Sequence, residues 1–279
     1  MKTTTVFLLS LMLMTGGKKD TFSNKSIEHR MVKVAPALFA NKYETTNEEY
    51  RIFLDWVKTE KPDLLETVSV AEENWEALGV KNRLSRYYSE HQAFDDYPVV
   101  NVSYEGATAF CEWLTDKYNS GPKKKYEEVK FRLPTEAEWR SMATAGRDYS
   151  MGYPWGGPYM KNAKGCYLAN FYNVSDHMVK IDINDRSKVE IQEDEVRGAL
   201  VGKGQYLVTA PVNAFIATGA GLHNLSGNVA EMMAEKGRTK GGSWGSSGYY
   251  LRIDAEDEFE GFTTSPYVGF RYVMEVIKE

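Results

Sequence analysis

The helical pattern in this sequence stops at about residue 147, and little regular periodicity replaces it. Beyond that point Gly, Asn, Tyr and Asp dominate, with short apolar pieces between them. The pieces at 209–212, 239–244 and 268–272 predict short strands separated by long loops. Long unstructured loops are uncommon in a compact domain. The chain carries 18 Tyr, 12 Phe and 6 Trp, and such rings can anchor loops by packing. We therefore expect a loop-rich fold.

Regular structure is predicted mainly before that point. Thr46-Asn47-Glu48-Glu49 and Thr135-Glu136-Ala137-Glu138 are capping boxes, each of which starts a helix. Ser103 opens a third helix, which ends at Asn119-Ser120-Gly121-Pro122. The alternating segment Met31-Val32-Lys33-Val34 predicts a first strand.

The first residues predict export. Lys2 precedes an apolar stretch at residues 6–14, and the small residues Thr15-Gly16-Gly17 follow it. The stretch is too short to span a bilayer and is typical of a secretory signal. We interpret residues 1–17 as a lipoprotein-like signal peptide, residues 18–30 as a linker and 31–279 as one domain. A lipidated cysteine would stand at Gly17, so either that cysteine was replaced or the segment is a plain signal peptide.

Charge and cysteine content exclude several classes of function. The net charge is −5 and the pI is about 5.6, which is not the basic footprint of a nucleic-acid-binding protein. Cys111 lies within a predicted helix and reads as a small buried residue, and Cys166 lies in a loop. Without a CxxC motif or a Cys/His cluster, the sequence predicts no zinc site. The acidic stretch within 172–205 is interpreted as a solvated insertion in preference to a metal site.

Nine motifs, in order along the chain, resemble one known family. They lie at residues 43–50, 97–114, 131–139, 153–156, 169–170, 211–212, 221–231, 241–244 and 269–271. On these residues the chain resembles the formylglycine-generating enzyme, or sulfatase-modifying factor, family. The resemblance implies an α+β fold, the loop-rich variant of the C-type lectin fold with low regular secondary structure. Residues 95–100, 153–159 and 162–171 are most similar to the gliding-motility and type IX secretion lipoproteins of that family.

The resemblance also bears on catalysis. The oxidases of this family bind copper(I) through two cysteines, and thiolates suit this soft ion. Those positions fall on Ser246 and Leu251 here, so we expect no copper and no oxidase of that mechanism. The iron-dependent sulfoxide synthases that resemble this family take histidines largely from an additional domain. The four histidines here are scattered along the sequence.

Calcium is the metal that the resemblance still implies. The loop from Asn224 to Glu231 matches a family site, with Asn224 and Glu231 as side-chain ligands and Gly227 and Val229 as carbonyl ligands. Alternatively, Glu231 caps backbone amides in a tight turn. Asn170 and the carbonyl of Phe171 match half of a second site, whose aspartate position falls near Gly204.

Three functional interpretations stay open at this point. The first is a non-catalytic scaffold or assembly component of a secretion or gliding-motility complex in the periplasm or outer membrane. Its partners would be other envelope proteins and not nucleic acid, with membrane contact only through the N-terminal signal or a lipid anchor. The second is an enzyme with altered chemistry, using Ser246, Asp254, Glu256 and Asp257. The third is a lectin-like carbohydrate-binding module. The aromatic residues Tyr249-Tyr250 and Phe259–Phe262 would either bind partners or pack the loops.

Overall fold

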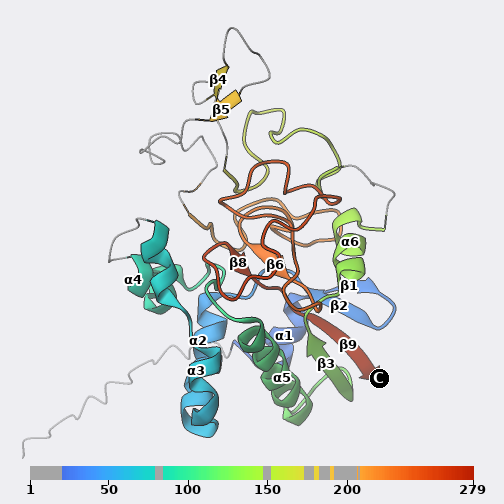
Figure 1. Cartoon of the computed structure of the whole chain (residues 1–279). Coiled ribbons are helices and arrows are strands. Elements are labelled where there is room, and N and C mark those ends of the chain that lie inside the picture. Colours follow the sequence, from blue (N-terminus) through green and yellow to red (C-terminus); the bar gives the residue numbers. More distant parts are fainter. Residues whose placement is uncertain are drawn as a thin grey trace, which may run out of the picture.

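The computed structural model describes residues 21–78, 84–146, 152–172, 179–181, 189–191, 206 and 208–279. The predicted signal peptide, Gly204 and most of the insertion at 172–205 lie outside the described residues. Figure 1 shows helices α1–α5 and one sheet at one end of the molecule, with the irregular C-terminal loops gathered above them. The expected mixture of helix, sheet and long loops is confirmed.

A four-stranded antiparallel sheet joins the two ends of the domain. Its strands are β1 (Met31–Ala35), β2 (Leu38–Asn41), β3 (Glu128–Arg132) and β9 (Val273–Lys278). The order is β1-β2-β9-β3, so the last strand of the chain lies between two strands from its first half. The predicted first strand is confirmed as β1. The central place of β9 depends on long-range pairing, which the local pattern does not reveal.

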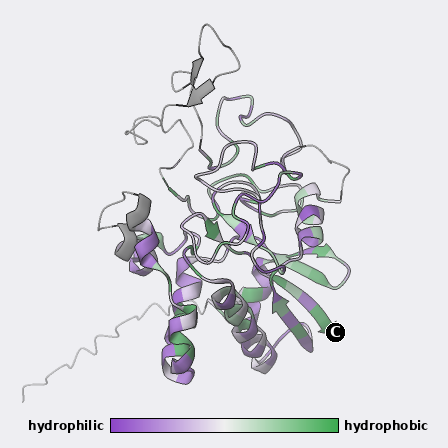
Figure 2. Cartoon of the chain, viewed as in Figure 1, coloured by the Kyte–Doolittle hydropathy of each residue, from purple (hydrophilic) through white to green (hydrophobic). Residues whose placement is uncertain are grey.

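The three predicted helices are confirmed with their caps. They are α2 (Asn47–Glu60), α5 (Tyr104–Ser120) and α6 (Glu136–Thr144). Both capping boxes form, because the Thr46 and Thr135 hydroxyls accept from the backbone N–H groups of Glu49 and Glu138. The helices α2 and α5 show apolar and polar residues along their length in Figure 2. Their apolar rings, including Tyr50, Phe53, Phe110 and Trp113, pack together in the largest core cluster.

Part of the segment predicted as a linker, residues 18–30, is a helix, so the predicted start of the domain at residue 31 is corrected. The segment Asn24–Arg30 forms α1, which Ser23 caps. Phe22 and Ile27 are buried in the main core, and this burial ties the segment to the domain although most of its residues are polar. The domain therefore begins before residue 31.

Several short helices connect α2 to α5. They are η1 (Pro62–Leu64), α3 (Leu65–Val68), η2 (Glu72–Leu78), α4 (Leu84–Glu90) and η3 (Gln92–Phe94). None of the helices in the described part of the chain combines the length and apolarity needed to cross a bilayer.

Apart from β9, the strands that the structure describes in the C-terminal half are two or three residues long. They are β4 (Val179–Ile181), β5 (Val189–Ile191), β6 (Ala230–Met232), β7 (Thr239–Lys240) and β8 (Val268–Gly269). The order β7-β6-β8 builds a small sheet, and the expected strands at 239 and 268 are confirmed in part. The strand expected at 209–212 does not form, because the backbone N–H and C=O of Ala210 pair with the Asn228 side chain at 2.6 and 3.2 Å. Ring contacts anchor the loops, as between Trp244 and Tyr267 at 4.7 Å.

Candidate functional site

The loop that leads into β6 is a tight, buried turn. Asn224, Gly227 and Asn228 have positive φ values of 52°, 76° and 65°, and glycine and asparagine adopt this conformation most readily. A Cβ atom on Gly227 would lie 2.4 Å from the carbonyl oxygen of Asn170. The turn can therefore approach Asn170 only because residue 227 has no side chain. The N–H of Asn228 then donates to the same carbonyl oxygen at 2.7 Å.

Glu231, in the middle of β6, forms a fully buried ion pair. Arg271 donates to its Oε1 from Nε and one terminal nitrogen, at 3.0 and 2.6 Å. The indole N–H of Trp139 donates to Oε2 at 3.1 Å. Arg271 also donates to the carbonyl oxygens of Asn41 and His223. The carboxylate thus accepts from side chains on α6 and beside β8 and joins three separate segments.

A second buried carboxylate, Glu44, lies in the same network. It accepts from the Asn224 amide at 3.0 Å and from the Asn228 amide, which lies 3.0 Å from both oxygens. Burial raises the pKa of Glu44 to about 8. Arg271 and the two amides lower the pKa, while the Glu231 carboxylate adds to the increase. Glu44 lies in the first quoted motif, but its partners are distant in sequence, so sequence reasoning did not identify it as a site residue.

The residues of the second predicted site lie against the first. Asn170 touches the turn through its carbonyl oxygen, and its amide donates to the Val208 carbonyl oxygen at 2.6 Å. Its Oδ1 accepts from the Tyr206 N–H at 3.3 Å. Phe171 is buried in a small apolar cluster with Leu251. The structure therefore places Asn170 of the possible second site against the turn of the first site, while the position near Gly204 lies outside the described residues.

The turn carries oxygen atoms of the kind that a hard cation binds, some of which are already hydrogen-bonded. Asn224 is 5% exposed, and its Oδ1 has no hydrogen-bond partner in the described part of the chain. The Glu231 carboxylate has roughly four lone-pair positions. Donors from Arg271 and Trp139 occupy three of them, which leaves one position for a metal ion. Two buried carboxylates also face one guanidinium. Calcium prefers such amide, carboxylate and carbonyl oxygens, and Gly227 and Val229 would supply the carbonyls.

A metal held mainly by acidic or soft side chains has less support. Within the described ranges, no three His, Cys, Asp or Glu side chains are grouped to hold a metal. Cys111 is buried, as expected, and burial raises the pKa of its thiol. Cys166 is a free, half-buried thiol in a loop. The His223 ring contacts the Phe215 carbonyl oxygen through Nδ1 at 2.7 Å.

Ser246 and Leu251 both point into the protein interior, and both are 0% exposed. The Ser246 hydroxyl accepts from the Ser243 N–H at 2.8 Å and lies 3.0 Å from the Ser243 hydroxyl. Leu251 packs with Ala169 and Phe171. The Ser246 side chain therefore forms hydrogen bonds with Ser243 and interacts with the Glu258 carboxylate, and the Leu251 side chain provides apolar packing.

The remaining candidate catalytic residues also have structural contacts. Both carboxylate oxygens of Asp257 accept from Thr239, at 2.6 and 2.5 Å. Asp254 pairs with Arg252 at 2.8 Å. Glu256 is exposed. The structure does not gather these acids around Ser246 through any hydrogen bond between described residues.

The aromatic loops divide into packed and exposed residues. Phe259 stacks against Tyr267 with ring centroids 5.6 Å apart, and Phe262 packs against the main core. Tyr249 is exposed and contacts Tyr250 edge to face. The packing interpretation therefore holds for the two phenylalanines, while Tyr249 is available at the surface.

Comparison with known proteins gives the family. Residues 8–276 match the model of the sulfatase-modifying factor enzyme 1-like domain. The chain belongs to this family. The described structure agrees with that assignment, since the family motifs at Glu44, Asn228, Glu231 and Arg271 meet in one buried network.

This sulfatase-modifying factor domain resembles both active and inactive relatives. It is 31% identical over 140 residues to the formylglycine-generating enzyme of Thermomonospora curvata, covering 50% of this chain and 34% of that protein. It is 27% identical over 190 residues to the inactive C-alpha-formylglycine-generating enzyme 2 of Bos taurus, covering 63% and 50%. The chain thus spans about a third to a half of the length of these relatives.

Two solved structures are also similar to this domain. PvdO from Pseudomonas aeruginosa aligns with a TM-score of 0.49 and 19% identity, covering 85% of this chain and 80% of that one. Treponema denticola variable protein 1 aligns with a TM-score of 0.49 and 18% identity, covering 85% of this chain and 84% of that one.

Proposed function

We propose that this protein is a non-catalytic member of the sulfatase-modifying factor family, exported to the periplasm or outer membrane. It acts as an assembly component of a secretion or gliding-motility type complex. The observation that carries the proposal is the buried state of Ser246 and Leu251, which stand at the positions of the copper-binding cysteines. The assignment to a secretion or gliding-motility type complex is supported by the sequence resemblance at residues 95–100, 153–159 and 162–171.

The chemistry of the two positions supports the lack of oxidase activity. Copper(I) is soft and selects thiolate ligands. A serine hydroxyl is a poor substitute, and a leucine side chain has no donor atom. The Ser246 hydroxyl already contacts Ser243, and Leu251 fills apolar space beside Phe171. Neither residue is positioned to bind a metal and a substrate together.

Exposed apolar side chains on the loops support a binding role. Tyr159 is 75% exposed, Ile216 81% and Tyr249 52%. Ile216 also borders a cavity of about 190 Å³ whose walls include Trp155 and Leu168. Aromatic residues are enriched at protein interfaces, so these exposed side chains suit contact with another envelope protein. Calcium at the Asn224 turn would stabilise the loops that present it.

A peptide oxidation assay tests the proposal. The purified protein is incubated with copper(I), oxygen, a thiol reductant and a cysteine-containing sulfatase peptide, and the product is analysed by mass spectrometry. The formylglycine-generating enzyme of T. curvata serves as the active control. We expect unchanged peptide with this protein, and formation of the aldehyde would overturn the non-catalytic assignment.

A second experiment tests the assembly role. The tagged full-length protein is purified from detergent-solubilised membranes, and co-purifying envelope proteins are identified and quantified. Replacing Tyr159 and Tyr249 with Ser should reduce a specific partner at unchanged expression. A protein that purifies alone under these conditions would contradict the assembly role.

A further inference from the structure

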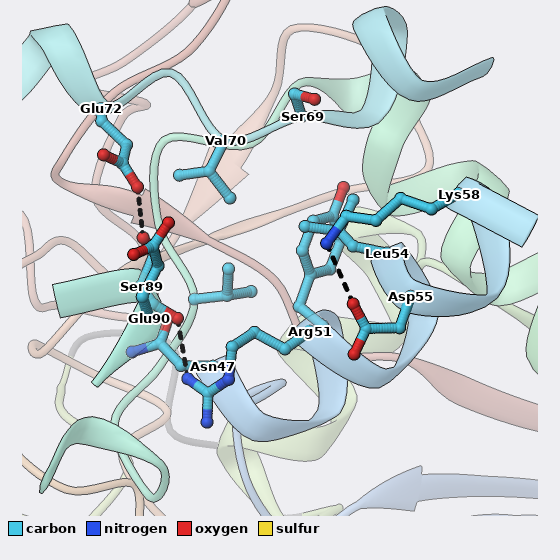
Figure 3. A pocket seen from close by; sticks show the side chains of 12 residues that line it. Asn47, Arg51, Leu54, Asp55, Lys58, Ser69, Val70, Glu72, Ser89 and Glu90 are labelled. Carbon is cyan, nitrogen blue, oxygen red and sulfur yellow. Dashed lines mark hydrogen bonds and ion pairs between the residues drawn. The ribbon is translucent and has the colours of Figure 1, made fainter. Parts of the chain in front are cut away.

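A cavity of about 230 Å³ lies between α2, residues 69–72 and the end of α4. It shares none of its lining residues with the turn at 224–231. Figure 3 shows Glu72, Ser89 and Glu90 on one side of this opening, with Asp55 and Lys58 on the other. Its volume is below the range of about 300–1,000 Å³ that is usual for drug-sized ligands, so it suits one short chain.

Part of the cavity wall is apolar. Leu54, Val70 and Val99 line it together with Tyr50. The Tyr50 hydroxyl donates to the Val68 carbonyl oxygen at 2.8 Å, which fixes the position of the ring. These side chains can contact the methylene groups of a bound chain.

The two cations that line the cavity already have anionic partners. Arg51 forms an ion pair with Asp95 and donates to the Ser89 carbonyl oxygen at 2.7 Å. The Lys58 ammonium lies 2.9 Å from the Asp55 carboxylate. Their charges are therefore largely compensated.

Among the side chains that the structure describes, the opposite wall of the cavity carries two carboxylates without a cationic partner, Glu72 and Glu90. Glu72 accepts a hydrogen bond from the Ser89 hydroxyl, and Glu90 is exposed. Neither carboxylate forms an ion pair with any side chain that the structure describes, a set that leaves out the side chains of residues 76–86. The cavity mouth therefore has an excess of negative charge, which favours a cationic guest.

Asn47 adds a buried acceptor to this cavity. The residue is 1% exposed, and its amide nitrogen donates to the carbonyl oxygens of Tyr88 and Phe94 at 3.0 and 3.1 Å. These bonds fix which amide atom is nitrogen. Its Oδ1 has no hydrogen-bond partner among the described residues. A buried acceptor without a donor is costly, and a guest that donates hydrogen bonds would remove this cost.

We propose that this cavity binds a primary ammonium group carried on a short methylene chain. The ammonium donates to Glu72, Glu90 and the Asn47 Oδ1, and the methylene groups lie on Leu54 and Val70. A lysine side chain of a partner protein and a free diamine share this chemistry. The site is independent of the function proposed above, because it uses none of the residues of the Asn224 turn.

Titration with two amines tests the site and separates the two sources. The full-length protein is titrated with cadaverine and with N-acetyl-lysine methylamide, and binding is followed by calorimetry and by amide shifts in NMR spectra. Pentanol is the neutral control. We expect saturable binding of at least one amine with a Kd of about 1 mM or tighter, and no binding of pentanol. Preference for the lysine derivative assigns a protein partner, and preference for cadaverine assigns a free diamine.

Charge variants decide whether the carboxylates of Glu72 and Glu90 are responsible for amine binding. The double variant Glu72→Gln with Glu90→Gln should weaken amine binding by about 10-fold or more, which corresponds to about 1.4 kcal/mol. The double variant Asp55→Asn with Lys58→Gln is the matched control, since it removes an ion pair on the other side of the same opening without changing the net charge. It should change the Kd by less than about 2-fold. Equal weakening by both variants, or no binding of either amine, would overturn the proposal.

Discussion

Arg271 and Glu231 form an ion pair in which neither side chain is exposed, with nitrogen–oxygen distances of 3.0 and 2.6 Å. Glu44 lies close enough to both to feel their charges. The core of this loop-rich domain therefore depends on a polar network as well as on apolar packing. Such a network is stabilising only while its members remain paired.

Removal of Arg271 should destabilise the protein strongly. Arg271→Met leaves Glu231 and Glu44 buried without their guanidinium, and breaking a buried pair in this way costs about 3–5 kcal/mol. Urea denaturation followed by circular dichroism measures the loss. Arg252→Met is the control, because the Arg252–Asp254 pair is about 30% exposed and should cost at most about 1 kcal/mol. Similar losses in both variants would show that burial of the Arg271 pair has no special importance.

Glu44 should make stability depend on pH. Its pKa is raised from 4.5 to about 8 in the folded protein, so the folded state binds this proton more tightly than the unfolded state. The contribution is complete below pH 4.5 and is lost as the pH rises through about 8, with a slope of at most about 1.4 kcal/mol per pH unit. Denaturation in EDTA between pH 5 and pH 9 measures this contribution to the free energy of unfolding. Glu44→Gln should flatten the curve, whereas Glu256→Gln at the exposed surface should not.

The sequence predicts local structure better than it predicts the site. The caps at Thr46, Ser103 and Thr135 act within one turn, so their residues are adjacent in the sequence. Glu44 instead meets Asn224 and Asn228, about 180 residues away, and only the folded chain shows that contact.

The strand expected at 209–212 does not form, and the reason is related. Its apolar pattern suits a strand, but Ala210 finds its hydrogen-bond partners in the Asn228 side chain. A tertiary contact of this kind overrides local propensity. The linker expected at 18–30 was also partly wrong, because two buried residues, Phe22 and Ile27, decide the packing of a mostly polar segment.

Calcium should stabilise the protein through the Asn224 turn. Calcium at 100 times its Kd would add about 2.7 kcal/mol, which thermal unfolding in calcium and in EGTA would detect as a higher melting temperature with calcium. Magnesium should have less effect, since it loses its water ligands reluctantly. Asn224→Ala should abolish the calcium effect, and Asn162→Ala in a separate loop should keep it. Identical melting curves in calcium and EGTA would remove calcium from this site.

Leu251 should contribute to stability as an ordinary core residue. Leu251→Ala removes buried methyl groups next to Ala169 and Phe171 and should cost about 2–5 kcal/mol. Leu64→Ala is a suitable control, because Leu64 is 37% exposed and a surface substitution usually changes stability by about 0.5 kcal/mol or less. Chemical denaturation compares the two. A small loss at Leu251 would indicate that the position faces an open groove.

Restoring the two cysteines should not restore oxidation. In the double variant Ser246→Cys with Leu251→Cys, both sulfur atoms would occupy positions that are 0% exposed in the present structure. The new thiol at 246 would lie in the turn with Ser243, and the one at 251 would lie among apolar side chains. Burial in such surroundings raises a thiol pKa and disfavours the thiolate that copper(I) requires. A competition assay with a copper(I) chelator should therefore show weak binding, and the peptide assay should show no aldehyde. Tight copper binding with oxidation of the peptide would mean that substitution at these two positions alone separates this chain from an active enzyme.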